Sequence, residues 1–380
     1  MSWLSGALSL LRGRDRFAQA ALPAGSRSDG KIADLTGPGI TDRWGVTATD
    51  LGAVVRARNG KLVAVFGDTF AGRRVGKGDW RSPVILIGDG DADTPIVWER
   101  AGGPDPDYAR QLRFYIHDHG PHWARGGIST VLPSDLLRVD DMLYLHVIVN
   151  RGLHRVIWTE IWSSADDGLT WEHMGEAAKF GADLHDGHAQ LWSWDYDPDD
   201  GWVYVASTGF QRDKGIIMRR VRPADIGDAS AYQAWGRRGG RWSWGGDATV
   251  LTPADERWGE LSLRRLDSGQ WVLGGFLASE YALGYRTLGS PTSPLTAAPV
   301  QRPVSGCRWP GESHVDCRVA QLYGGYLLPG SRLDVPGGVG LVVSHWNTNH
   351  GWPYRVMQFR VTLRDTTGDS IESPAPRQDA

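Results

Sequence analysis

The chain is poor in cysteine, has no long hydrophobic run and carries almost no net charge, and each of these features excludes a class of protein. Its 380 residues include two cysteines, Cys307 and Cys317. Two thiols without paired histidines nearby do not make a zinc site, and their short separation leaves a disulfide between them open. No apolar run approaches the length of a membrane span, and a formal net charge of −3 gives no basic field for nucleic acid.

The N-terminal segment also lacks the usual order of a secretion signal. A mildly apolar stretch over residues 3–11 has no basic segment before it, and its arginines come afterwards. If its target lies outside the cell, we expect the protein to leave the cell by another route, for instance on a virus particle or after lysis. Residues 1–40 are predicted to form an arm, in part a short helix, that either docks on a partner or is disordered.

Glycine and tryptophan are abundant instead, with 50 and 19 copies beside 21 prolines. With short apolar runs, this composition predicts many strands joined by tight turns. Tryptophan also suits a sugar ligand, because its ring stacks on the apolar C–H face of a sugar while the hydroxyls meet polar groups. The alternative is that most of these tryptophans belong to the core.

The stretch from Trp44 to Phe70 contains the strongest local signal. Asn59 and Gly60 lie between two β-rich runs, which is the typical sequence of a tight hairpin. The hairpin brings Asp50, before its first strand, near Asp68, at the end of its second. Both have small or apolar neighbours, among which burying a carboxylate costs free energy, so a carboxylate there suggests a function. Two carboxyl groups facing one space suit general acid–base chemistry on a glycosidic bond; the alternative is that both only tie down turns.

Five clusters of short strands follow one another from residue 41 to residue 363, with no long helix between them. This recurrence predicts an all-β, five-bladed β-propeller over 41–363, with a two-sheet sandwich as the competing fold and a polar tail over 364–380. Residues 164–171, SADDGLTW, have the form of an Asp box, a turn between the outer strands of a propeller blade. Because its Asp and Gly suit a tight turn, we assign Asp166 and Asp167 to structure and not to catalysis.

Several segments in a fixed order carry a resemblance to a known family. They are FGDTF at 66–70, SSADDGLTW at 163–171, RRV at 219–221, WGELS at 258–262 and LYGGY at 322–326. Together they resemble an actinobacterial domain family, long of unknown function, whose characterised members are endo-D-arabinanases. The resemblance covers about 41–363. It implies a five-bladed propeller that cleaves the D-arabinan of arabinogalactan and lipoarabinomannan in the cell walls of mycobacteria and their relatives.

The resemblance also implies a catalytic pair. The family has two essential aspartates on its first blade, and the matching positions here are Asp50 and Asp68. The family contains secreted cellular enzymes and phage-borne members, and the weak secretion signal favours a phage-borne one, such as a protein of the virion tail, over a secreted enzyme. Residues 1–40 would then dock on other virion tail proteins. Which carboxyl is the acid stays open, although Phe66 and Phe70 favour Asp68, because an apolar pocket raises the pKa of a carboxyl. We expect no cofactor and no metal at the catalytic site, and leave open whether calcium lies at the propeller axis.

Further residues are candidates for substrate contact. Glu260 is either a third carboxylate of the site or the partner of a nearby arginine. Tyr323 and Tyr326 suit stacking on a sugar near the propeller axis, with core packing as the alternative. Trp44 completes the aromatic candidates.

Two histidine-containing segments need separate interpretations. Asp186 and His188 precede a strand and are expected to present a carboxylate and an imidazole to the central pocket. Residues 117–122 contain three histidines and an aspartate, the residue types of a metal site, but no second ligand set accompanies them. For that segment we therefore predict a loop between blades.

Two other classes of function would use the same cavity. A binding module would hold arabinan as a receptor without cutting it, and a structural propeller would serve as a virion part attached through residues 1–40. The Asp pair favours the enzyme, because a pure binder has no need for both carboxyls. Sialidase chemistry fits less well, since no arginine triad with a nucleophilic tyrosine is identifiable.

Overall fold

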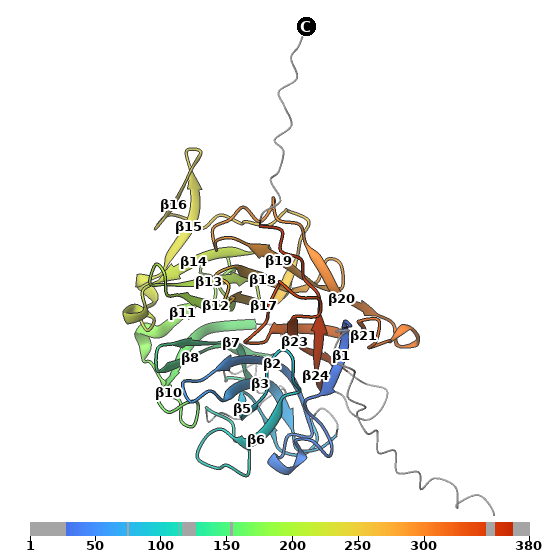
Figure 1. Cartoon of the computed structure of the whole chain (residues 1–380). Coiled ribbons are helices and arrows are strands. Elements are labelled where there is room, and N and C mark those ends of the chain that lie inside the picture. Colours follow the sequence, from blue (N-terminus) through green and yellow to red (C-terminus); the bar gives the residue numbers. More distant parts are fainter. Residues whose placement is uncertain are drawn as a thin grey trace, which may run out of the picture.

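The computed structural model describes residues 28–73, 76–113, 115, 127–152, 155–346 and 354–367, which form five sheets around one axis (Figure 1). The five-bladed, all-β propeller expected from the sequence is thereby confirmed. The helical elements of these residues are 3-10 turns at Asp42–Trp44, Glu176–Ala178, Pro223–Asp225, Ala229–Ala231 and Trp309–Gly311. None of the helices in the described part of the chain has the length and apolarity that a membrane crossing needs.

Each blade is one sheet. Blade 1 contains β2 (Ala48–Arg56), β3 (Leu62–Phe70), β5 (Val84–Asp89) and β6 (Val97–Ala101), with β4 (Trp80–Arg81) paired to β3. Blade 2 contains β7 (Thr130–Val139), β8 (Met142–Arg151), β9 (Arg155–Ser164) and β10 (Glu172–His173), with β11 (Lys179–Gly181) paired to β9. Blade 3 contains β12 (Leu191–Asp197), β13 (Trp202–Thr208), β14 (Ile217–Val221), β15 (Gln233–Arg238) and β16 (Arg241–Trp244).

The last two blades complete the circle. Blade 4 contains β17 (Trp258–Arg265), β18 (Trp271–Leu277), β19 (Ala282–Leu288), β20 (Gln301–Cys307) and β21 (Arg318–Ala320). Blade 5 contains β22 (Leu322–Leu327), β23 (Val339–Trp346), β24 (Tyr354–Val361) and β1 (Gly30–Asp34). Cys307 and Cys317 are both free thiols, so the disulfide left open by the sequence is not formed.

The strands β2, β7, β12, β17 and β22 form the innermost ring, in which each contacts the next and β22 returns to β2. β2 and β17 are buried over almost their whole length, because neighbouring blades cover both faces of these strands. The polar side chains that these strands carry, among them Asp50, Glu260 and Arg264, are therefore buried as well. The ring places the starts of all five inner strands at the same end of the axis, where the candidate site lies.

A buried arginine joins several of the innermost strands, and we call its hydrogen bonds the axial network. Arg264 of β17 forms a two-pronged ion pair with Asp135 of β7, at 2.6 and 2.7 Å. The same carboxylate accepts hydrogen bonds from the Ser193 hydroxyl and the Trp194 amide of β12. Three blades are therefore joined by one buried network.

The propeller is closed by its N-terminal strand. β1 pairs antiparallel with β24, from Gly30 opposite Arg360 to Asp34 opposite Met357. Beyond the strand, the Leu35 amide donates to the Val356 carbonyl at 2.9 Å. The propeller thus begins by residue 30, so the boundary predicted at residue 41 is too late. The sequence does not reveal this strand, because its five residues include one long apolar side chain and form too weak a pattern. Its partner strand also lies at the other end of the chain, so no hairpin signal marks it.

Two local predictions are confirmed. β2 and β3 form a hairpin around Asn59-Gly60, where the Asn59 side chain accepts a hydrogen bond from the Lys61 amide. The Asp box makes the turn between β9 and β10. There the Asp166 carboxylate accepts from the Thr170 amide and hydroxyl, and the side chain of Trp171 packs against the core of blades 1 and 2.

Candidate active site

A central cavity of about 760 Å³ lies where the inner strands begin, and all five blades contribute to its wall. Most of the wall is apolar or aromatic, and its polar side chains include two aspartates, one glutamate and one arginine. The lining residues are Asp50, Leu51, Asp68, Trp80, Leu132, Pro133, Ser134, Ile148, Leu191, Phe210, Gln211, Arg212, Glu260, Tyr323, Tyr326, Trp346 and Tyr354. A concave, mostly apolar site with a few converging polar groups is the usual form of a small-molecule site.

Irregular pairing between β2 and β3 sets Asp50 and Asp68 into this cavity. Thr49 pairs with Thr69 and Leu51 with Phe66, so the register shifts twice around the two aspartates. Such bulges re-aim side chains out of the regular alternation of a strand. Asp50 and Asp68, which the sequence suggested as a pair, therefore both line the cavity.

The Asp50 carboxyl is held in an environment that disfavours its charge. The residue is 7% exposed, and its Oδ1 accepts no hydrogen bond from the described residues. Its Oδ2 accepts a 3.0 Å hydrogen bond from the Tyr323 hydroxyl. Burial, followed by the negative charges of Asp68 and Glu260, raises the pKa of Asp50 well above its usual value, although the Tyr323 bond lowers it.

Gly67 makes the room for this carboxyl. A Cβ atom at Gly67 would lie 2.4 Å from Asp50 Oδ1, so any larger residue would displace the group. The close approach of the Asp50 carboxyl thus explains why the FGDTF segment has a glycine at position 67. The space beside the strand is filled by the Asp50 oxygen and by the Leu51 side chain, whose Cδ1 would lie 2.9 Å from the same Cβ atom.

The Asp68 carboxyl is more accessible and better supported. The residue is only partly buried, and its Oδ1 accepts a 2.9 Å hydrogen bond from the indole N–H of Trp80. Burial raises the pKa of Asp68 to about 6, while the polar groups of Trp80 and Thr130 lower it. Of the two aspartates, Asp50 is therefore the more difficult to ionise, which is the reverse of the preference drawn from Phe66 and Phe70.

Glu260 combines the two interpretations offered by the sequence. It lines the cavity, and it is also paired with an arginine, because the Arg212 Nε lies 2.9 and 3.1 Å from its two oxygens and Nη2 bonds to Oε1. Arg212 in turn lies over the Tyr323 ring, with its Cζ 5.4 Å from the ring centroid. Burial raises the pKa of Glu260 and the Arg212 charge opposes that rise.

The two predicted tyrosines are both in the cavity wall. Tyr323 holds Asp50, and Tyr326 is buried beside it with 1% of its surface exposed. Sequence reasoning missed Trp80, Trp346 and Tyr354, which complete the aromatic wall. No local pattern distinguishes these three from core aromatics, because each reaches the cavity only through the pairing of its strand with a partner.

Three other predicted residues lie outside the central cavity. Trp44 is buried in the core of blade 1, with the Arg43 guanidinium 3.8 Å from its ring centroid, so it offers no face to a ligand. Asp186 lines a neighbouring hollow. His188 is half-buried, and its Nδ1 lies 2.9 Å from the carbonyl oxygen of His185.

Metal binding finds no support in the described residues, where no group of three or more His, Cys, Asp or Glu side chains could hold an ion. The histidine segment 117–122 lies outside the described residues.

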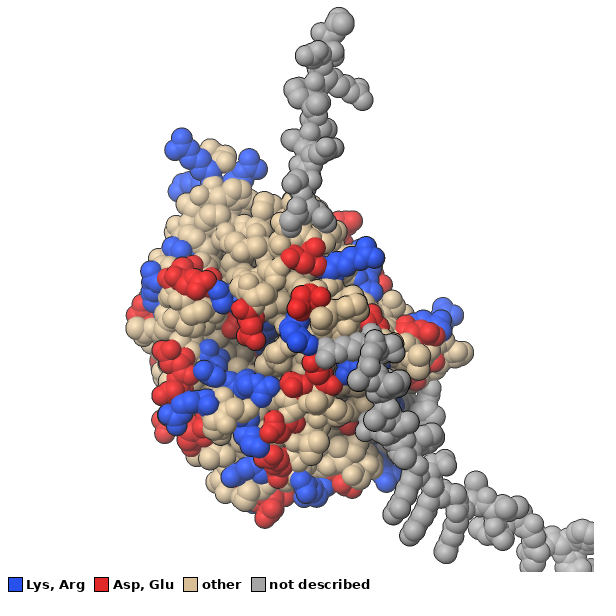
Figure 2. Space-filling view, viewed as in Figure 1, with Lys and Arg blue, Asp and Glu red and all other residues tan. Residues whose placement is uncertain are grey.

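Lys and Arg are interspersed with Asp and Glu over the face shown in Figure 2, apart from basic side chains at the tip of the β15–β16 hairpin.

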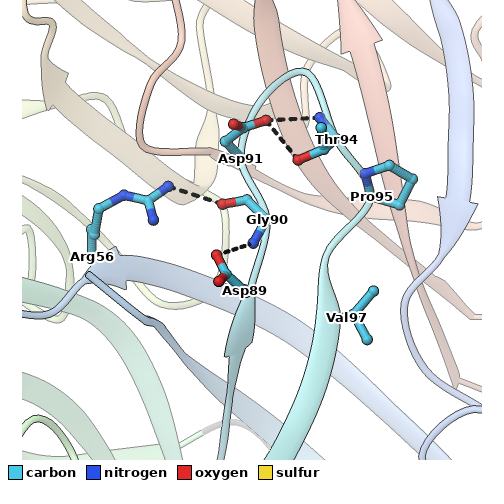
Figure 3. Close-up of a pocket in the computed structure, with 7 residues that line it drawn as sticks. All are labelled: Arg56, Asp89, Gly90, Asp91, Thr94, Pro95 and Val97. Carbon is cyan, nitrogen blue, oxygen red and sulfur yellow. Dashed lines mark hydrogen bonds between the residues drawn. The ribbon is translucent and has the colours of Figure 1, made fainter. Parts of the chain in front are cut away.

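A further hollow of about 450 Å³ lies at the far end of β2, beyond Arg56 (Figure 3). Its polar groups bond to one another. Asp91 Oδ1 accepts from the amide and hydroxyl of Thr94, and the Arg56 guanidinium donates to the Gly90 carbonyl. Because these groups serve the turn itself, this hollow has no pair of carboxyls free for chemistry.

Comparison with known proteins identifies relatives in two kingdoms. An uncharacterized 35.9 kDa protein of Mycolicibacterium smegmatis is 31% identical over 352 residues, which are 87% of this chain and 97% of that protein. The notoamide biosynthesis cluster protein J' of Aspergillus versicolor is 30% identical over 324 residues, which are 80% of this chain and 83% of that protein.

A solved structure shares the fold, and a family is matched. A putative hydrolase from Bacteroides ovatus superposes with a TM-score of 0.55 at 14% identity, covering 85% of this chain and 87% of that one. Residues 36–360 match the family described as a domain of unknown function, DUF4185. With nearly the whole propeller matched, the chain belongs to the DUF4185 family.

Proposed function

We propose that this protein is a glycoside hydrolase that cleaves the D-arabinan of actinobacterial arabinogalactan and lipoarabinomannan at internal bonds. One observation carries the proposal. Asp50 and Asp68 face one aromatic cavity, where burial raises the pKa of Asp50 well above its usual value and the pKa of Asp68 to about 6. A pair of carboxyls whose pKa values are pushed apart is the arrangement that acid–base cleavage of a glycosidic bond requires.

The environments assign the two roles. Asp50, the more buried carboxyl, retains its proton and donates it to the glycosidic oxygen as the bond to the anomeric carbon breaks. Asp68, as a carboxylate, either takes a proton from the attacking water or attacks the anomeric carbon itself. Tyr323 and Trp80 fix the orientations of the two groups through their hydrogen bonds.

The cavity wall suits a furanose polymer. Trp346 and Tyr354 offer apolar faces for sugar rings, and the Glu260–Arg212 pair offers acceptors and donors for hydroxyls. The choice of D-arabinan as the polymer rests on the family resemblance. Such a substrate places the site of action outside the cell. Attachment to a phage tail through the N-terminal residues stays a prediction.

The test is digestion of purified mycobacterial arabinogalactan, followed by chromatography of released oligosaccharides. The comparison includes Asp50→Asn, Asp68→Asn and, as a matched control, Asp141→Asn, whose exposed carboxylate pairs with Arg58. We expect arabino-oligosaccharides from the wild type and the control, and a loss of at least about 100-fold in each site variant. Plant L-arabinan and a β-galactan serve as alternative polymers.

Two results would contradict the proposal. Binding to arabinogalactan without release of products would make the protein an arabinan-binding module. Hydrolysis that survives both substitutions would place the chemistry elsewhere. Circular dichroism of each variant separates a lost reaction from a lost fold.

A further inference from the structure

A second hollow lies beside the central cavity and shares a wall with it. This side hollow has a volume of about 400 Å³, within the range of about 300–1,000 Å³ that is usual for ligand sites. Its lining residues are Arg155, Val156, Asp183, Asp186, Gly187, Gln190, Gln211, Asp213 and Lys214. Gln211 lines both spaces, and Arg212, the next residue, holds Glu260 in the central cavity.

One side chain joins the two loops that form the shared wall. The Gln190 amide nitrogen donates a 2.7 Å hydrogen bond to the Ala182 carbonyl, and its oxygen accepts a 3.1 Å bond from the Phe210 amide. The loop before β12 and the loop between β13 and β14 are thereby joined immediately before Gln211. A polymer that leaves the central cavity over Gln211 would enter the side hollow.

Charged side chains of both signs converge on the hollow. Asp183 and Asp186 come from the loop before β12, and Asp213 and Lys214 come from the loop after β13. Gly209 leaves the space for the second pair, since a Cβ atom there would lie 2.9 Å from both Asp213 Oδ1 and Lys214 Cδ. Carboxylates accept hydrogen bonds and an ammonium donates them, so together they match the hydroxyls of a sugar, which do both.

The mixed charge also argues against a cation as the ligand. Lys214 and Arg155 both line the hollow beside its aspartates. Within the described part of the chain, no three acidic, histidine or cysteine side chains are grouped closely enough to hold a metal. A neutral, hydroxyl-rich ligand fits this set of side chains better than an ion of either sign.

We infer that the side hollow is an outer subsite that binds the sugar units of a polymeric glycan beyond those in the central cavity. This inference rests on the proposed function and extends it, because it predicts that the enzyme acts faster on long chains than on short ones. Asp186, which the sequence suggested for substrate contact, then meets the substrate at a distance from the cleaved bond.

The experiment measures kcat/KM on mycobacterial arabinan and on a short arabino-oligosaccharide that fills only the central cavity. The variants are Lys214→Met, which removes the ammonium and keeps the alkyl chain over Gly209, and Asp186→Asn. Asparagine suits the positive φ of 55° at position 186. Lys61→Met is the matched control, since Lys61 pairs with Asp89 and Glu99 far from the hollow.

We expect each subsite variant to lower the ratio of kcat/KM for the long to the short substrate by about tenfold, the effect of one hydrogen bond to a charged group. The control should keep the wild-type ratio. An unchanged ratio in both variants, or an equal loss on both substrates, would overturn the inference while leaving the proposed function intact. A wild-type protein that cleaves neither substrate would instead refute the proposed function, and the subsite with it.

Discussion

The hydroxyl of Tyr323, on the first strand of blade 5, donates a 3.0 Å hydrogen bond to Asp50, on the first strand of blade 1. These blades are the last and the first of the circle, and they meet where β2 contacts β22, β23 and β24. The position of the buried carboxyl thus depends on the closure of the fold. A residue 273 positions away in the sequence fixes its orientation.

This bond gives a prediction for the pH dependence of activity. The Tyr323 hydroxyl stabilises the ionised form of Asp50, so Tyr323→Phe should raise the pKa of Asp50 further. If Asp50 is the proton donor, activity is lost as pH rises through its pKa, and the alkaline limb of the kcat/KM profile should move to higher pH. The rate at the optimum should fall by about tenfold, since the carboxyl loses its orientation.

A pH–rate profile of wild type, Tyr323→Phe and Tyr108→Phe would check this. Tyr108 bonds to Asp79 on the surface, so its variant controls for the loss of a phenol hydroxyl. A shift of the alkaline limb to lower pH in Tyr323→Phe would assign the limb to another group.

The raised pKa of Asp68 predicts a cost in stability. Its folded-state pKa is about 6 against 3.8 for the free side chain, so the folded protein binds the proton more tightly than the unfolded chain does. The penalty is therefore absent below about pH 4, grows as pH rises to 6 and is complete above it. The free energy of unfolding of Asp68→Asn should exceed that of the wild type by about 1–3 kcal/mol at pH 8 and should equal it at pH 4.

Urea unfolding at the two pH values measures this difference. The same substitution should abolish hydrolysis, so stability and activity would change in opposite directions at one residue. A gain of equal size at both pH values would show that the effect does not come from ionisation of Asp68.

Five residues of the cavity could be predicted, and three of them, Glu260, Tyr323 and Tyr326, lie in segments that carry the family resemblance. Asp50 and Asp68 were found because one hairpin brings both to the same place, and the Asp box because its turn chemistry is local. Trp80, Trp346 and Arg212 were not found, since each enters the cavity through contacts between separate strands or loops. The strand β1 was missed for the same reason, because its only partner is β24. Trp44 was wrongly predicted to contact substrate. An aromatic residue near Asp50 in the sequence looks the same whether its side chain packs in the core or lines the cavity.

The axial network predicts a large loss of stability. Asp135 is fully buried and is the counter-charge of Arg264, so Asp135→Asn leaves a buried guanidinium without its partner. We expect a loss of about 3–5 kcal/mol in the free energy of unfolding. Asp199→Asn removes a carboxylate that pairs with Arg265 but is 79% exposed, and should cost about 1 kcal/mol or less. Equal losses in urea unfolding would mean that the axial pair adds nothing beyond a surface pair.

The Asp box predicts a difference in stability between the alanine variants of two glycines whose φ angles are nearly equal. Gly168 and Gly103 have φ angles of 88° and 87°, so alanine pays a similar conformational strain of about 1–2 kcal/mol at either position. A Cβ atom at Gly168 would lie 2.8 Å from Cγ1 of Val63 on blade 1, whereas nothing lies within 4 Å at Gly103. Val63 is fully buried and cannot move without disturbing the core between the blades.

Gly168→Ala should therefore lose about 1–3 kcal/mol more than Gly103→Ala in urea unfolding, the typical cost of overpacking. Gly168→Ala combined with Val63→Ala should lose less than the sum of the two single variants, because the smaller side chain makes room for the new methyl group. Additive losses would indicate that the clash is relieved by movement of the turn. In that case the Asp box would not fix the contact between blades 1 and 2.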